Sequence, residues 1–151
     1  MFGNFDISLL YLFYIKNILN KEVRTMAKFL TPEWMEAYKE VWNNDSELRE
    51  GLKKFSATIK YYIEGSDQPP VYAKVEKGEV VEVGVAGDGK YDFEMWATPE
   101  NWQKLAQGEI GPKAAMATKK LNFKGSMLTA MKYMGPFGRS LELMSKVPTE
   151  W

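Results

Sequence analysis

The sequence predicts an α+β domain in which a layer of helices packs on one face of a largely antiparallel sheet. Residues 55–97 alternate apolar and polar side chains, which is typical of strands with one buried and one solvated face. Residues 32–52 and 99–147 instead repeat apolar side chains at helical spacing. With 151 residues the chain is long enough for one domain with a single core.

The first 25 residues differ from the rest. The nine residues 7–15 form an apolar run, which is too short to cross a bilayer because a spanning helix needs about 20 residues. Asp6 precedes the run where a signal peptide carries positive charge, and Met26 begins a segment typical of a translation start. We expect the domain to comprise residues 26–151. Residues 1–25 are then either an extension upstream of the true start or a short helix that docks on the domain, a partner subunit or a membrane surface. The docking side chains of such a helix would be Leu9, Leu12, Phe13 and Ile15.

The first helix of the domain is predicted to begin at residues 31–33. Thr31 is a good N-cap, and Pro32 suits the first helical position. Asn43, Asn44 and Asp45 end this helix, and residues 46–52 form a second, short one.

Strands are predicted next. The first covers residues 55–63 and is followed by a turn at 65–70 and a second strand at 71–75. A tight turn at Lys77-Gly78 leads to a third strand, whose buried face carries Val81, Val83 and Val85. Gly87-Asp88-Gly89 is a hairpin signal before a fourth strand at 91–97. The four strands are therefore expected to form an antiparallel meander.

Helices return after residue 97. Thr98-Pro99-Glu100 repeats the helix start, and Pro112 opens another helix after Gly108. Leu121 and Phe123 indicate a short last strand that ends at Gly125, and Ser126 caps the following helix. Gly135-Pro136 is expected to interrupt that helix and to act as a hinge.

The composition excludes several kinds of site. The chain has no histidine and no cysteine, so it lacks a Ser-His-Asp triad, thiolate chemistry, disulfides and imidazole or thiolate metal ligands. Gly84, Gly87 and Gly89 precede a strand and do not open a helix, so they do not form a phosphate-binding loop. Asp92 and Glu94 are paired carboxylates on one strand face, and we expect that face to be solvated. The sequence therefore predicts no catalytic residue, no metal site and no cofactor.

The net charge of zero conceals an asymmetry. Residues 1–111 carry 13 basic and 18 acidic side chains, a net charge of −5, whereas residues 112–151 carry seven basic and two acidic ones, a net charge of +5. A basic segment either forms a solvated face or attracts anionic lipid, phosphate or carboxylate. Nucleic acid is not an expected partner, because no recognition motif accompanies the charge. Five of the nine methionines lie in the last 36 residues, where they either fill core gaps or adapt to varied apolar ligands.

Residues 98–131 carry a pattern of linked motifs. The pattern consists of a helix ending at Gly108, the helix with Pro112, Ala115 and Met116, the strand with Lys120, Leu121, Phe123 and Gly125, and the helix with Ser126, Met127, Ala130, Met131 and Lys132. This pattern resembles the sterol carrier protein family, in its type-two sterol-binding domain. The resemblance extends over about residues 32–147.

The resemblance implies a five-stranded sheet with helices on one face that enclose an apolar tunnel. It also implies an intracellular carrier that holds fatty acids, fatty acyl-CoA, phospholipids or sterols without chemistry and makes transient contact with membranes. We expect the tunnel to be lined by Phe93, Met95, Trp102, Leu105, Met116, Phe123, Leu128, Met131, Met134, Phe137, Leu141 and Met144. Head-group or membrane contact is expected from Lys119, Lys120, Lys132 and Arg139. The chain ends at Trp151 without a Ser-Lys-Leu-type peroxisomal signal, which predicts a cytoplasmic location.

Two alternatives remain open. The same apolar surfaces would serve a protein interaction or homodimerisation module of the same fold. A histidine-free enzyme would use Asp92 or Glu94 on a lipid substrate.

Overall fold

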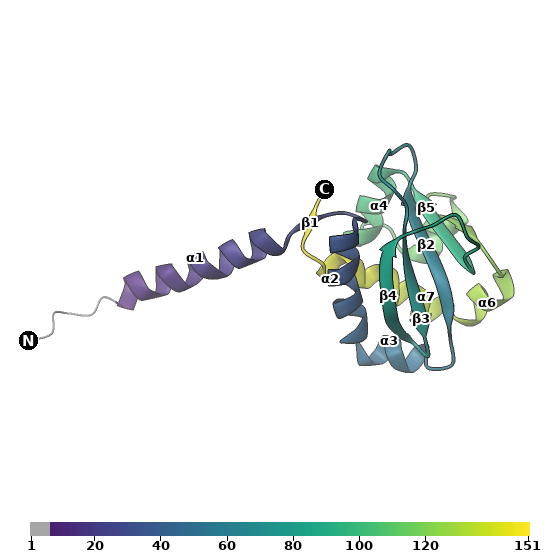
Figure 1. Ribbon diagram of the computed structural model, residues 1–151, viewed down its shortest axis with the longest axis horizontal. Coiled ribbons are helices and arrows are strands. Elements are labelled where there is room, and N and C mark those ends of the chain that lie inside the picture. The colour runs from purple at the N-terminus through teal and green to yellow at the C-terminus, as the bar shows by residue number, and fades with distance from the viewer. Residues whose placement is uncertain (1–6) are drawn as a thin grey trace, which may run out of the picture.

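The computed structural model describes residues 7–151 and places a projecting helix beside one domain. Helix α1 (Ile7–Thr25) extends away from the domain (Figure 1). Leu9, Leu12 and Phe13 are 62–65% exposed on it, so they do not pack on the domain. Strand β1 (Ala27–Lys28) follows α1 and pairs in parallel with β7 (Thr149–Glu150), which brings the two ends of the domain together.

The first two helices of the domain form as predicted. Helix α2 covers Pro32–Asn43, and the Thr31 hydroxyl accepts a hydrogen bond from the Trp34 N–H at 3.3 Å. Helix α3 covers Ser46–Gly51. The buried face of α2 carries Trp34, Met35, Tyr38 and Trp42. Trp42 also donates its indole N–H to the Gly78 carbonyl oxygen at 2.9 Å, so α2 is fixed to the turn between two strands.

The main sheet has five strands in the order β4-β3-β2-β5-β6. These are β2 (Ala57–Ile63), β3 (Val71–Glu76), β4 (Glu79–Val85), β5 (Phe93–Ala97) and β6 (Asn122–Lys124). Neighbouring strands are antiparallel except β2 and β5, which run parallel with Ile59 opposite Phe93. The predicted α+β class and the largely antiparallel sheet are therefore confirmed.

The predicted four-stranded meander is wrong beyond β4. Strands β4 and β5 are not neighbours, so Gly87-Asp88-Gly89 is not a hairpin turn but part of a connection that crosses the sheet. Residues 86–92 pass over the solvated face, where the Tyr91 ring lies 5.9 Å from the Tyr72 ring between centroids. Alternation predicts which face of a strand is buried, but it does not specify the strand's neighbours.

Strand β4 also departs from the predicted alternation. The register between β3 and β4 shifts at Lys74/Val75, so Val80 is opposite Val75 and is buried, while Val81 is 43% exposed. A β-bulge of this kind inserts an extra residue and changes which side chains face the core. Val85, at the end of this edge strand, is 54% exposed. The prediction that Val81 and Val85 are buried is therefore wrong.

The remaining helices cover the buried face of the sheet. They are α4 (Pro99–Ala106), α5 (Pro112–Ala117), α6 (Met127–Lys132), α7 (Met134–Glu142) and the 3-10 helix η1 (Leu143–Lys146). Thr98 and Ser126 cap α4 and α6 as predicted. The predicted interruption at Gly135-Pro136 is displaced, because the break falls at Tyr133 and Pro136 lies in the first turn of α7. Proline is tolerated there, since its missing N–H would have no helical partner.

Candidate functional site

The sheet and the C-terminal helices converge on a small closed space. It is lined by Met95 of β5, Phe123 of β6, Pro112 and Met116 of α5, Ala130 of α6, and Met134, Phe137, Gly138 and Leu141 of α7. The volume is about 10 Å³, which is about the space of one water molecule. No side chain in this lining is charged or carries a hydrogen-bonding group. The chemistry of the space therefore matches an apolar group.

Six of the twelve side chains predicted to line a tunnel meet around this space. They are Met95, Met116, Phe123, Met134, Phe137 and Leu141. Phe93 lies beside them, with its ring centroid 5.5 Å from that of Phe123 and 5.7 Å from that of Phe137. The helical spacing of Met134, Phe137 and Leu141 places all three on the inner face of α7.

The other five predicted side chains lie elsewhere. Trp102, Leu105 and Met144 are buried outside this lining, and the Trp102 indole N–H donates to the Tyr62 carbonyl oxygen at 2.9 Å. Leu128 and Met131 of α6 are 84% and 67% exposed. The inward residue of α6 is Ala130, which is 1% exposed.

Small residues at this space were missed by sequence reasoning. Pro112, Ala130 and Gly138 line it, although the predicted set contained only large apolar side chains. A small residue lines a space because it lets the backbone approach closely. Its role can be predicted from the sequence only when the elements that face it are known. Pro112 and Ala130 are part of the sequence pattern that resembles the sterol carrier protein family, and this pattern could have indicated that they line the space.

Arg139, predicted to contact a head group, is held by an ion pair. Its Nε lies 2.5 Å from Asp45 Oδ2, its Nη2 lies 3.0 Å from Asp45 Oδ1, and its Nη1 lies 3.0 Å from Glu47 Oε2. The guanidinium donates the first two contacts as hydrogen bonds to the Asp45 carboxylate and holds the pKa of Asp45 below its usual value. Arg139 therefore links α7 to α3 in this structure.

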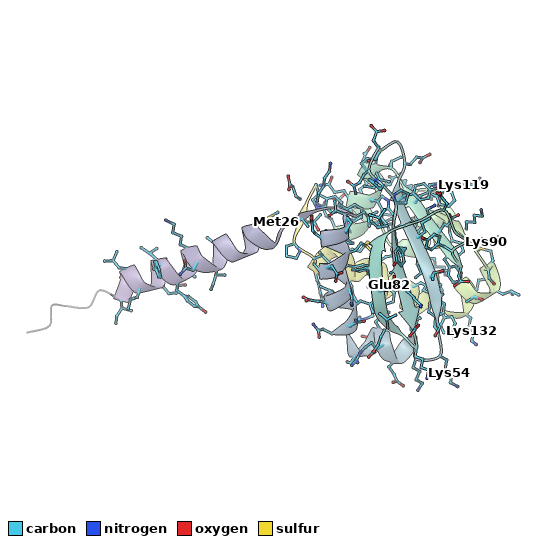
Figure 2. All side chains as sticks on the ribbon, in the orientation of Figure 1. Met26, Lys54, Glu82, Lys90, Lys119 and Lys132 are labelled. Atoms are coloured by element: carbon cyan, nitrogen blue, oxygen red, sulfur yellow. The ribbon has the colours of Figure 1, made fainter. Side chains whose placement is uncertain are left out.

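The three predicted lysines are exposed. Lys119 and Lys120 follow α5, and Lys132 ends α6 with its Nζ 5.4 Å from the centroid of the Tyr133 ring. Figure 2 shows Lys119 and Lys132 far apart on the side of the domain that faces away from α1. They are too widely separated there to form one cluster.

Asp92 and Glu94 lie outside the apolar space. Asp92 Oδ2 accepts hydrogen bonds from the backbone N–H and the hydroxyl of Thr58, at 2.9 and 3.3 Å. Glu94 forms ion pairs with Lys60 at 3.6 Å and with Lys124 at 3.7 Å. Both carboxylates thus join neighbouring strands at the solvated face. Among the side chains that the structure describes, in residues 7–19 and 26–151, no group of three or more acidic ones is placed to hold a metal ion.

Comparison with known proteins agrees with this geometry. Residues 35–138 match the sequence profile of the SCP-2 sterol transfer family. The chain belongs to the SCP-2 sterol transfer family. The crystal structure of sterol carrier protein 2 is similar to the domain with a TM-score of 0.73 at 18% identity, over 80% of this chain and 99% of that one.

Two further structures share the SCP-2 fold. A conserved hypothetical protein from Thermus thermophilus has a TM-score of 0.59 at 18% identity, over 80% of this chain and 87% of its own. Sterol carrier protein 2 like 2 from Aedes aegypti has a TM-score of 0.52 at 13% identity, over 78% of this chain and 98% of its own. No curated protein matches the chain in sequence.

SCP-2 membership supports a role in binding or transferring sterols or other lipids. It agrees with a five-stranded sheet and a helical layer that meet at an apolar space. Among the described residues, none of the helices has the length and apolar character needed to cross a bilayer.

Proposed function

We propose that this SCP-2 domain holds the apolar part of a lipid between β5, β6 and helices α5, α6 and α7, and carries it without chemical change. The observation that supports this most is the convergence of methionines from three elements, Met95, Met116 and Met134, on one apolar space. Methionine side chains are unbranched and flexible, so they adapt to ligands of different shape.

Binding requires the space to expand, since its volume of about 10 Å³ cannot hold an acyl chain. Each methylene group moved out of water contributes about 0.8 kcal/mol, so a tail of about 16 carbons supplies roughly 13 kcal/mol against the cost of opening. The break at Tyr133, between α6 and α7, is the place where the helical layer can separate. We expect α6 to move outward when a tail enters.

The ligands we propose are fatty acids, fatty acyl-CoA or sterol-like lipids. An apolar space selects ligands by length and width, and a positively charged surface favours those with an anionic head group. Lys132 is free to contact such a head group, and Lys119 and Lys120 are free to contact an anionic membrane surface, whereas Arg139 would first have to leave Asp45. The cytoplasmic location stays a prediction from the sequence.

Displacement of a fluorescent fatty acid, together with native mass spectrometry of the purified chain, tests the proposal. We expect bound lipid in the mass spectrum and displacement at micromolar concentration. Ala130→Leu adds three carbon atoms at the closed space, in the path of an entering tail, and should weaken binding in protein whose native fold is verified by circular dichroism, whereas Ala117→Leu adds the same atoms at an exposed position of α5 and should not. The absence of both signals from the unmodified chain would overturn the proposal.

We also propose a second function, self-association through α1. The observation that favours it is the exposure of its large apolar side chains, which reaches 77% at Ile7. Residues 7–15 of α1 are apolar apart from Ser8, and a helical segment that is apolar on every side is normally buried against another surface. Sedimentation analysis should show a dimer for residues 1–151 and a monomer for residues 26–151, and a monomer in both cases would refute association.

A further inference from the structure

An open hollow of about 410 Å³ lies where β2, β5 and α6 come together. Its lining includes the charged residues Lys54, Asp92 and Lys132 and the aromatic residues Phe55, Phe93 and Tyr133. In Figure 2, Lys54 and Lys132 lie near each other at the end of the domain opposite α1. The hollow is distinct from the closed apolar space, because the two share no lining residue.

A single layer of aromatic rings separates the hollow from the closed space. The Phe55 ring lies 5.1 Å from the Tyr133 ring and 5.2 Å from the Phe137 ring, between centroids. Phe137 lines the closed space, and so does Phe123, whose ring lies 5.5 Å from that of Phe93. Rings that line the hollow are therefore in direct contact with rings that line the closed space.

The far wall of the hollow depends on a close approach at Gly125. This residue has φ +149°, and a Cβ there would lie 2.4 Å from Phe93 Cδ1 and 2.8 Å from the Asp92 carbonyl oxygen. Only glycine allows the chain to pass so closely over Phe93. The next residues, Ser126 to Lys132, then lie along the hollow and place the Lys132 ammonium group at its rim.

The charges of the hollow favour an anion. Lys54 and Lys132 are exposed and form no ion pair in the described part of the chain, whereas the Asp92 carboxylate accepts two hydrogen bonds from Thr58. A larger groove of about 580 Å³, between α3, α5 and α7, has no excess of positive charge. There Lys113 and the ion-paired Arg139 are matched by Glu47 and Glu142.

We propose that this hollow is the entrance of the lipid site and binds the carboxylate or phosphate group of a single-chain amphiphile. Lys54 and Lys132 hold the anionic group, and the tail passes between Phe55, Phe93 and Tyr133 toward the closed space. Tyr133 lies at the junction of α6 and α7, so its movement opens the ring layer and loosens α6 together. This inference rests on the proposed lipid-binding function and adds the position and charge of the entrance.

Binding of palmitate and of hexadecanol, its uncharged analogue, tests the entrance. Two solvent-exposed charge contacts are lost in Lys54→Met/Lys132→Met, and we expect affinity for palmitate to fall about tenfold, with little change for hexadecanol. Lys119→Met/Lys120→Met is the matched control, because it removes the same charge outside the hollow. Both doubly substituted proteins should fold, since all four side chains are exposed.

The outcomes distinguish failure of the proposed entrance from failure of the proposed lipid-binding function. If palmitate binds both doubly substituted proteins as it binds the unmodified chain, or if only Lys119→Met/Lys120→Met weakens binding, the entrance is wrong and the lipid site stands. If neither palmitate nor hexadecanol binds the unmodified chain, both proposals fail. Inorganic phosphate that binds as tightly as palmitate, in a manner that requires Lys54 and Lys132, would show a site for free anions and overturn the entrance.

Discussion

Leu141→Ala should make the protein less stable and more receptive to lipid. Leu141 is 2% exposed and lines the closed space, so its truncation removes three carbon atoms from a packed site. At about 0.8 kcal/mol for each group, the transfer term is roughly 2.4 kcal/mol. The unfilled volume adds to this, and we expect a total loss of about 3 to 4 kcal/mol in the free energy of unfolding.

Leu105→Ala is the matched control for this prediction. Leu105 is also 2% exposed, but it lies in α4 and does not line the space. Both substitutions should lower the free energy of unfolding in urea by similar amounts without lipid. A ligand that enters the space binds only the folded form, and at about 100 times its Kd it adds roughly 2.7 kcal/mol.

The difference between the two variants with lipid is the decisive measurement. Palmitate should stabilise Leu141→Ala by at least about 1 kcal/mol more than it stabilises Leu105→Ala, because the larger space holds the tail with less displacement of side chains. Equal stabilisation of both variants, or weaker palmitate binding by Leu141→Ala than by the unmodified chain, would show that the tail does not occupy this space.

Three further predictions concern backbone, pH and the N-terminal helix. Gly125→Ala should lower the free energy of unfolding by about 3 kcal/mol, because its Cβ meets Phe93 and its φ disfavours side chains, whereas Gly87→Ala has open space and should change it by less than about 0.5 kcal/mol, both measured by urea unfolding. The pKa of Asp45 is lowered in the folded state, so its contribution is present above the unfolded pKa of about 4 and is lost as pH falls through the folded value. Acid titration by circular dichroism should therefore show a shallower loss of stability below pH of about 4 in Asp45→Asn. Removal of residues 1–25 should leave the Tm of the domain unchanged in dilute solution, because α1 projects away from it, and a drop of several degrees would show a contact that stabilises the domain.

Local features of the fold could be predicted from the sequence. Thr31, Thr98 and Ser126 cap their helices because a cap depends only on the next three residues. The break between α6 and α7 was expected near Gly135 but falls at Tyr133, since proline fits the first turn of a helix as well as it ends one.

The order of strands could not be predicted in the same way. The buried and solvated side chains of β5 alternate as predicted. Its parallel neighbour in the sheet is β2, however, and β3 and β4 lie between the two in the chain. The bulge where the register of β3 and β4 shifts, at Lys74/Val75, also could not be predicted from the alternation of apolar residues. A bulge changes the faces to which the valines of β4 point, and the sequence of valines itself carries no sign of it.

The candidate site was predicted in part for similar reasons. Met134 and Leu141 were found because their spacing defines one face of α7. Leu128 and Met131 were assigned to the interior because the short helix α6 carries several large apolar residues, although the small Ala130 is the one that packs inward. Lys54 was overlooked because it lies far in sequence from the basic C-terminal segment that it joins in space.

The parallel pairing of β1 with β7 determines how the domain can be joined to other molecules. Ala27 lies opposite Thr149, so the chain enters and leaves the domain at one pole, while α6 lies at the other (Figure 1). A fluorescent protein, an affinity tag or a surface tether attached at either end would therefore leave the α6 side unobstructed. Immobilised on a sensor chip through α1 or through Trp151, the domain would present Lys132 and the hollow beside it to lipid vesicles in the flowing solution.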